Sequence, residues 1–303
     1  MQIHRERRRS VEALERLTVR AEELVAEASQ PLKPLSSPIP GVVLVRHLAP
    51  TSAEATLYKP IVCLILRGRK ETQFAGETVR VGAGEALLVS HDVSIVARAV
   101  QAPYLALVFE IDLSVLRSLY EELGELLVGD GPASALQVNK AEEPLIEALE
   151  RYLALAQRPT DARVLGAMVR REIHYRLLMA PFGTMLRKLL RHDSHASAIA
   201  RAMAILRRDY RAPMEVAQLA REVGMSVSSF HKHFKQLACS SPLQYQKELR
   251  LLEAQRLLSA GTPVTSVAYD VGYESPTQFS REYARKFGRA PSKDLSAALR
   301  RAT

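Results

Sequence analysis

Apolar positions follow three patterns along the chain, and each pattern predicts a different kind of structure. Over residues 1–29 they recur three and four apart, which predicts an amphipathic helix. Prolines at positions 31, 34, 38 and 40 then end this helix and form a connector. Short apolar runs broken by glycines follow from residue 42 to residue 112, and helical spacing returns from residue 113 onward.

The short apolar runs predict β-strands. Several short strands at close spacing favour an antiparallel sandwich or a small barrel, a shape that can hold a small ligand. Arg69, Lys70 and Arg80 can line such a barrel or lie on its rim, and we favour the rim. The clearest runs are VVLVRHL, IVCLILRG, ETVRVGAG, EALLVS and LALVFEI, with Gly68, Gly76, Gly82 and Gly84 between them.

Three helices follow the predicted strands, over residues 114–128, 142–157 and 161–179, with Ser114 and Asp161 as expected N-caps. The second and third helices have broad apolar faces, which can cover the strands or form a dimer interface. We favour the interface for part of them, because they carry more apolar surface than one small sheet needs. We expect residues 181–196 to be a basic hinge. The apolar faces consist of Leu145, Ile146, Leu149, Leu153, Leu155, Val164, Ala167, Met168, Ile173 and Leu177.

A repeat in the C-terminal part gives the strongest signal in the sequence. The segment QLAREVGMSVSSFHKHFKQLACSSP aligns with SVAYDVGYESPTQFSREYARKFGRAP, with one residue inserted in the second copy. Two matched blocks with a single slip indicate a duplicated unit. Before the insertion Ala220, Val223 and Gly224 match Ala268, Val271 and Gly272, and after it Phe230, Phe234 and Pro242 match Phe279, Tyr283 and Pro291.

Each copy predicts a helix-turn-helix unit. A short helix, residues 215–222 or 264–270, is followed by a glycine at the turn, where a left-handed backbone is tolerated. Ser226 or Ser275 then caps a second helix that carries one apolar stripe. Its opposite face is polar and basic, which suits a helix in the major groove of DNA. The candidate DNA-binding residues are Ser228, Ser229, His231, Lys232 and Lys235 in the first copy, and Thr277, Gln278, Arg281 and Arg285 in the second.

The segment between the copies, residues 243–259, has a strong helical pattern and predicts a rod about 25 Å long. Such a rod can place two recognition helices about one DNA turn, roughly 34 Å, apart on one face of the duplex.

Composition narrows the possible classes of protein. The chain has 303 residues, enough for about two domains. No stretch approaches the roughly 18 apolar residues of a membrane span, and residues 1–29 lack the apolar run of a signal peptide. Cys63 and Cys239 are too few for a disulfide framework or a four-cysteine zinc site. These features favour a cytoplasmic setting.

The positive charge is concentrated in the C-terminal part. Residues 181–303 contain 20 Lys and Arg against 10 Asp and Glu, a net charge of +10. The first 180 residues contain 22 basic and 23 acidic side chains, a net charge of −1. This division is expected if the C-terminal part meets phosphate, although basic surfaces also occur in proteins that bind no nucleic acid.

The segment VTSVAYDVGYESPTQFSREYARKFGRAPSKD resembles the signature of the AraC/XylS family DNA-binding domain. By motif position, the resemblance implies that Ser228, His231 and Lys232 face bases or phosphates in the first unit. It implies the same for Thr277, Gln278 and Arg281 in the second. Two residues depart from the family pattern. Tyr283 stands where the family usually has Phe, and Asp294 stands near the place of a Tyr-Arg pair.

The N-terminal half also resembles the AraC-type regulatory domain, a cupin-like barrel with a helical dimerisation part. The resemblance rests on YKPIVCLILRGRKE, PYLALVFEID and REIHYRLLMAPFG, and it covers roughly residues 38–183. It implies an effector pocket inside the barrel but does not identify the effector.

Two other classes of protein are alternatives to a ligand-gated regulator. A metal-dependent enzyme of the cupin type needs two or three histidines and a carboxylate pointing inward. The predicted strands offer only His47 and His91, far apart in sequence, and His231 and His233 point apart on their helix. We therefore expect no catalytic residues, no metal and no cofactor. A constitutive DNA binder whose N-terminal domain only dimerises has the same sequence features as a ligand-gated regulator.

The sequence thus predicts an α+β protein of two domains, with a cupin-like antiparallel β-barrel and flanking helices followed by an all-α domain. The all-α domain holds two helix-turn-helix units joined by a long helix. The expected boundaries are 1–37 for the N-terminal helix and connector, 38–183 for the sensing and dimerisation domain, 184–194 for the linker and 195–303 for the DNA-binding domain. We expect a homodimeric transcription regulator, more often an activator by resemblance. Its expected partners are double-stranded promoter DNA, RNA polymerase and a small-molecule effector.

Overall fold

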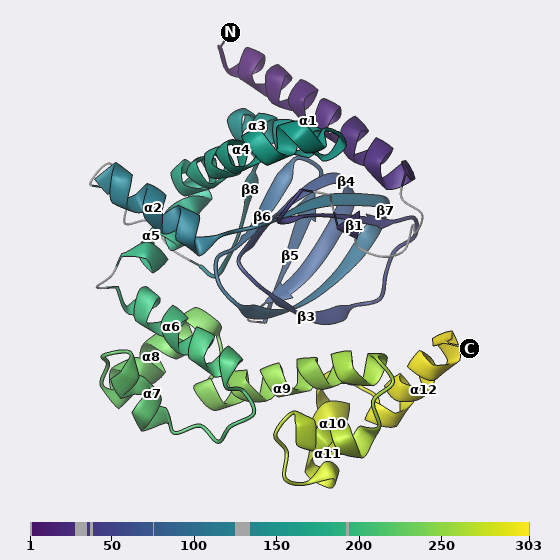
Figure 1. Ribbon diagram of the computed structural model, residues 1–303, viewed down its shortest axis with the longest axis vertical. Coiled ribbons are helices and arrows are strands. Elements are labelled where there is room, and N and C mark those ends of the chain that lie inside the picture. Colours follow the sequence, from purple (N-terminus) through teal and green to yellow (C-terminus); the bar gives the residue numbers. More distant parts are fainter. Residues whose placement is uncertain are drawn as a thin grey trace. The chain divides into compact units, whose positions relative to one another are not determined.

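The computed structural model describes residues 2–27, 35–36, 39–74, 76–124, 134–191 and 194–302. The chain divides into two compact units, of which the first takes in most of the chain up to Arg191 and the second the chain beyond it (Figure 1). None of the helices in these described ranges is long and apolar enough to cross a membrane.

The first unit is built around an antiparallel sheet. Strands β1, β2, β7, β4, β6 and β8 are neighbours in that order, β3 also pairs with β7, and β5 pairs with β4. Two long strands, β4 and β7, pair with each other along most of their length and connect the rest. The strands are β1 (Leu35–Ser36), β2 (Val42–His47), β3 (Glu54–Tyr58), β4 (Ile61–Phe74), β5 (Glu77–Gly82), β6 (Glu85–Val89), β7 (Val93–Glu110) and β8 (Leu136–Lys140).

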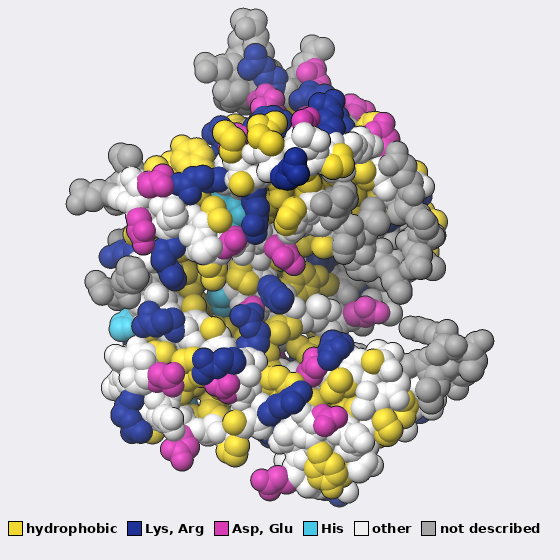
Figure 2. Space-filling view, in the orientation of Figure 1, with side chains coloured by type: hydrophobic (Ala, Val, Ile, Leu, Met, Phe, Trp, Pro, Cys, Tyr) yellow, Lys and Arg dark blue, Asp and Glu magenta, His cyan; other side chains and the backbone are white. Residues whose placement is uncertain are grey.

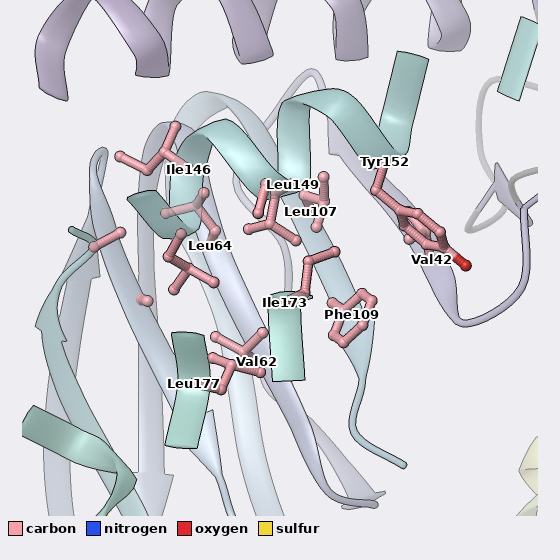
Figure 3. Close-up of a cluster of buried hydrophobic side chains, with 14 of the residues drawn as sticks. Val42, Val62, Leu64, Leu107, Phe109, Ile146, Leu149, Tyr152, Ile173 and Leu177 are labelled. Atoms are coloured by element: carbon pink, nitrogen blue, oxygen red, sulfur yellow. The ribbon is translucent and has the colours of Figure 1, made fainter. Parts of the chain in front are cut away.

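The two faces of this sheet have separate cores. Alternation along β4 sends Val62 and Leu64 to a face covered by helices, and Cys63 and Ile65 to the opposite face. On the helix-covered face, strand residues pack against helix residues such as Ile146 (Figure 3). On the opposite face, side chains from β4, β5, β6 and β7 pack on one another, so the sheet curves around them. We call this second face the inner face.

Helices α1 (Gln2–Glu27), α3 (Glu143–Ala154) and α4 (Pro159–Met179) lie on the helix-covered face, and α2 (Leu113–Leu123) and α5 (Thr184–Leu190) join the same core (Figure 1). The predicted N-terminal helix is confirmed over the described residues, although Val11 is exposed rather than buried. Positions 28 and 29 of that prediction, and the proline connector apart from Pro40, lie outside the described residues.

Two predicted N-caps are wrong. The N-cap of α2 is Asp112, whose carboxylate accepts the Ser114 backbone N–H at 2.9 Å, so Ser114 lies within the first turn. Helix α4 begins at Pro159, so Asp161 also lies within the first turn rather than at the cap. Acidic and polar residues are favourable in both places, which is why composition alone misplaced the start. Helix α2 ends at Leu123 with Gly124 as its C-cap, and residues 125–128 of the predicted helix lie outside the described residues.

Helix α5 replaces most of the hinge that we expected over residues 181–196. A short 3-10 turn, Pro181–Gly183, leads into α5, and Phe182, Leu186 and Leu190 are buried in the core of the first unit. The basic residues of this segment suggested a linker, but its apolar residues complete the core and hold it as a helix.

Lys70 is also not where the sequence placed it. Arg69 and Arg80 are exposed as expected for rim residues, whereas Lys70 is only 6% exposed. Register shifts between Ile65 and Lys70 change the phase of β4, so that Lys70 pairs across the sheet with inner-face residues of β5 and β7. Each β-bulge adds an unpaired residue and turns the following side chains to the other face.

The apolar faces of α3 and α4 have different roles. In α3, Leu145, Ile146 and Leu149 are buried against the sheet, so this face covers the strands. In α4, Ile173 and Leu177 are buried in the same way, but Val164 and Met168 are 63% and 68% exposed. Part of α4 therefore remains available for an interface.

From His195 onward, every element of the second unit that the structure describes is a helix. The unit contains α6 (His195–Arg208), α7 (Val216–Glu222), α8 (Val227–Ala238), α9 (Pro242–Ser259), α10 (Val264–Asp270), α11 (Pro276–Phe287) and α12 (Pro291–Ala302). The pairs α7–α8 and α10–α11 are the two predicted helix-turn-helix units, and α9 is the predicted rod between them (Figure 1). The sequence therefore predicted the α+β class and the architecture of this unit correctly.

Candidate nucleic-acid interface

The two helix-turn-helix units are built by the same local devices. Gly224 and Gly272 occupy the turns with φ of 76° and 88°, a backbone region that favours glycine. Ser226 and Ser275 then cap α8 and α11, and each hydroxyl accepts the backbone N–H three residues later at 3.3 Å. These four predictions are confirmed, and they fix where each second helix begins.

The apolar stripes of α8 and α11 anchor these helices in the second unit. Phe230 and Phe234 on α8, and Phe279 and Tyr283 on α11, have no exposed surface. Within each pair the ring centroids are 5.5 Å and 5.6 Å apart, in tilted aromatic contact. Burial of one stripe leaves the opposite face of each helix towards solvent.

The candidate DNA-binding residues lie on these solvent faces. Eight of the nine are exposed, and Ser229 is half-buried because it lies next to the buried stripe. The exposed residues are Ser228, His231, Lys232 and Lys235 on α8, and Thr277, Gln278, Arg281 and Arg285 on α11.

On the face drawn in Figure 2, Lys and Arg side chains alternate with Asp and Glu and with uncharged surface. Several arginines of the second unit are held by carboxylates, such as Arg208 by Asp209 and Arg256 by Glu253. The net charge of +10 for residues 181–303 already subtracts these carboxylates, so the excess positive charge lies on the other Lys and Arg side chains.

The two departures from the family pattern are partners in the structure. The Tyr283 hydroxyl donates a 2.6 Å hydrogen bond to Asp294 on α12, and the same carboxylate pairs with Arg289 at 2.6 Å. Burial raises the pKa of Tyr283, and the Asp294 carboxylate raises it further. Tyr283 thus packs in the apolar stripe as Phe would, and Asp294 accepts the hydrogen bond of its hydroxyl group.

Recognition helix α11 is also held by a buried carboxylate. Glu282 accepts from the Lys247 ammonium of α9 at 2.9 Å, from the Tyr273 hydroxyl at 2.8 Å and from the Gln278 side-chain amide at 3.3 Å. Burial raises the pKa of Glu282, but these three donors lower it by more, so its pKa lies below the ordinary value. We call Glu282, Lys247, Tyr273 and Gln278 the Glu282 cluster.

Arg250 of α9 connects the two helix-turn-helix units within the second unit. Its guanidinium donates to the carbonyls of Tyr210, Arg211 and Ala212 in the loop after α6, and to the Gly272 carbonyl in the second turn. Gln246 donates to the Tyr210 and Ala212 carbonyls from one turn earlier. Gly272 itself packs closely on the Arg211 backbone. A Cβ at position 272 would lie 2.5 Å from the Arg211 carbonyl oxygen, so only glycine fits there without a shift.

A histidine pair supports α8. The rings of His195 and His233 stack with centroids 4.0 Å apart. Burial lowers the pKa of His233, and the neighbouring His195 and Lys232 lower it further. The spacing of His231 and His233 predicts that they point apart on α8. The contact between His233 and His195 is not predictable from the sequence, because it depends on how α6 packs against α8.

Sequence reasoning missed the Glu282 cluster and Arg250. The available signals were an acidic residue within a basic recognition helix and an arginine within the apolar pattern of α9. Neither signal identifies a partner, because Lys247 lies 35 residues from Glu282, and the Gly272 and Tyr210 carbonyls lie 22 and 40 residues from Arg250.

The histidines of the sheet are engaged in other contacts. His47 stacks with Tyr104 at 5.8 Å, and His91 hydrogen-bonds Ser90 at 2.9 Å. Within the part of the chain that the structure describes, no group of three or more His, Cys, Asp or Glu side chains could hold a metal ion.

Comparison with known proteins agrees with this architecture. Residues 38–185 match the family described as AraC-type transcriptional regulator N-terminus, and residues 219–296 match a helix-turn-helix domain. The thermoregulatory protein LcrF of Yersinia pestis is 24% identical over 234 residues, which cover 76% of this chain and 86% of LcrF. The virulence regulon transcriptional activator VirF of Yersinia enterocolitica is 23% identical over 234 residues, with the same two coverages.

Solved structures of ToxT from Vibrio cholerae have a similar fold. An apo ToxT variant superposes with a TM-score of 0.54 at 12% identity, over 84% of this chain and 97% of that chain. Wild-type ToxT with a bound unsaturated fatty acid gives the same TM-score and identity, over 84% of this chain and 93% of that chain. At this identity the likeness concerns the fold alone.

The fold and the duplicated units define a DNA-binding transcription regulator with a separate N-terminal domain. The chain belongs to the AraC family of transcription regulators.

Proposed function

We propose that the protein binds double-stranded promoter DNA through the solvent faces of α8 and α11, and that each helix enters a major groove. The observation that carries the proposal is the duplicated unit, with its stripe fully buried and its polar face exposed in both copies. Lys232, Lys235 and Arg285 would contact phosphates, which set affinity, whereas His231, Gln278 and Arg281 would contribute to base choice. Ser228, Ser229 and Thr277 would assist from the first turns of the helices.

A footprint on the protein's own upstream DNA tests this arrangement. Protection over two successive major grooves on one face of the duplex is expected, because α9 has 18 residues and is about 27 Å long. Arg281→Ala should lower specific affinity by about 1–3 kcal/mol if Arg281 contacts a base. Protection of a single groove, or unchanged affinity of Arg281→Ala, would contradict the proposal.

We further propose that the sensing domain spans residues 38–183 and that the DNA-binding domain spans residues 195–303. The protein would act in the cytoplasm as a homodimer that recruits RNA polymerase, with no catalytic activity of its own. The exposed Val164, Leu165 and Met168 of α4 support a dimer contact, because large apolar side chains gather there on one helix. Met168→Glu should shift the mass in sedimentation towards the monomer. An unchanged mass would exclude this face.

A small-molecule effector would bind at the inner face of the sheet. Lys70 and Thr72 lie there fully or almost fully buried, and the Thr72 hydroxyl has no hydrogen-bond partner. ToxT, of similar fold, has been solved with an unsaturated fatty acid. A fatty acid that raises the melting temperature and changes operator affinity would support ligand gating, because a ligand acts only through different affinities for two states. A constitutive binder, the alternative, would show neither effect with any metabolite.

A further inference from the structure

The amide of Gln278 is held in one orientation before DNA binds. A glutamine side chain has two N–H donors and one carbonyl acceptor, and its two ends are nearly equal in size. The Glu282 carboxylate only accepts hydrogen bonds, so the nitrogen end of Gln278 must be the end that faces it, at 3.3 Å. Gln278 is otherwise exposed on the solvent face of α11.

Glu282 is itself fixed by groups outside the recognition helix. Its side chain is 11% exposed, and it is held by Lys247 from α9 and by Tyr273 from the turn before α11. Its lowered pKa keeps it ionised at neutral pH. The orientation of Gln278 is therefore set by the body of the DNA-binding unit and not by the exposed side chain alone.

When Glu282 accepts the N–H that is remote from the carbonyl, the opposite edge of the amide is left with one acceptor and one donor side by side. The free groups are the carbonyl oxygen and the second N–H of Gln278. In the major groove adenine offers an adjacent acceptor and donor at N7 and N6, guanine offers two acceptors, and cytosine offers a donor alone. The free edge of Gln278 complements adenine.

We propose that Gln278 reads one adenine of the target site, and that Glu282 is the positioning residue that gives Gln278 this specificity. This inference rests on the proposed function, because it requires the solvent face of α11 to meet bases. Glu282 touches no DNA. It reduces the rotamer freedom that Gln278 would lose on binding, and it prevents the amide from presenting its reversed edge.

Selection from randomised duplexes with the full-length protein tests the assignment. The wild-type protein should enrich a site with an invariant adenine at one position. Gln278→Ala should lose the preference at that position alone, with a fall in affinity on the order of 10- to 100-fold, as for a bidentate base contact. Glu282→Ala should keep the other preferences and weaken discrimination for this adenine by about 2- to 10-fold, the effect of freeing one side chain.

Two comparisons separate positioning from a general loss of folding. Glu282→Gln keeps an acceptor oxygen near Gln278 and should restore most of the adenine preference, and Glu253→Ala, on the exposed side of α9, should change nothing. Replacing the adenine by 7-deazaadenine should weaken wild-type binding but leave Gln278→Ala unaffected.

The possible outcomes are distinct. A preference lost in Gln278→Ala for a base other than adenine, or full adenine preference in Glu282→Ala, would overturn the inference and leave the proposed function standing. No enrichment of any sequence by the wild-type protein would remove the proposed function, and this inference with it.

Discussion

Arg250→Ala removes the connection between the two helix-turn-helix units. The hydrogen bonds of Arg250 allow the resulting loss in free energy of unfolding to be estimated. Arg250 donates to four backbone carbonyls. Two of them, those of Tyr210 and Ala212, keep a hydrogen bond from Gln246 after the substitution. The carbonyls of Arg211 and Gly272 lose the guanidinium donors at 3.0 Å and 2.8 Å.

Each carbonyl left without a hydrogen-bond donor lowers the free energy of unfolding by about 1–3 kcal/mol when water cannot replace the lost donor. The Arg250 site is half-buried, so water replaces part of the loss, and we expect a total of about 2–3 kcal/mol. Arg250→Lys should recover less than half, because an ammonium cannot reach several carbonyls as the guanidinium fork does.

Hydrogen exchange read by mass spectrometry across a urea series measures this cost within the second unit of the full-length protein. Peptides of α10 and α11 should lose protection at lower urea in Arg250→Ala. Arg256→Ala is the matched control on the same helix. Its exposed pair with Glu253 should contribute at most about 1 kcal/mol. If the two variants unfold at the same urea concentration, Arg250 does not connect the units.

Five other substitutions, in four predictions, have definite expectations, each measured by urea unfolding. Gly272→Ala should cost more than Gly288→Ala. Both glycines have a left-handed φ, which costs about 1–2 kcal/mol for alanine. Only at Gly272 would the added Cβ also lie 2.5 Å from a backbone oxygen, that of Arg211. Equal losses of stability would contradict this close packing. Cys239 ends α8 with a left-handed φ of 53°, at the position where the second copy has Gly288. Cys239→Gly should therefore raise the free energy of unfolding by about 0.5–1 kcal/mol. A lower free energy of unfolding would show that the Cys239 side chain contributes more than its backbone strain costs. Tyr283→Phe should cost about 1 kcal/mol through its lost hydrogen bond, and a neutral result would mean that this bond adds nothing. The pKa of Glu282 is lowered from 4.5 by folding, so its contribution to stability is present above pH 4.5 and is lost as pH falls through the lower value. Glu282→Gln should therefore lose less stability than the wild-type protein on acidification, and an identical profile would contradict the lowered pKa.

The parts of the fold that depend on local pattern were predictable from the sequence. The turn glycines, the serine caps and the aromatic stripes of α8 and α11 each follow from residues a few positions apart. The two matched copies confirmed one another, so even the helix boundaries there were correct to within one residue.

The parts that depend on distant contacts were not predictable. The sequence predicts Lys70 at the rim together with Arg69 and Arg80, and the bulges of β4 that turn Lys70 inward leave no clear mark in the sequence. Helix α5 was read as a hinge because its burial depends on a core made elsewhere in the chain. The Glu282 cluster joins three segments that only the folded second unit brings together.

The proposed function depends on sequence-specific DNA binding by the two exposed helix faces. The most direct test is a fluorescence-anisotropy titration of the full-length protein on DNA from its own upstream region, with scrambled DNA as the control, at two salt concentrations. We expect tighter binding to the natural DNA and a steep loss of affinity at the higher salt, because phosphate contacts release counterions. Absence of binding to either DNA at low salt would contradict the proposed function.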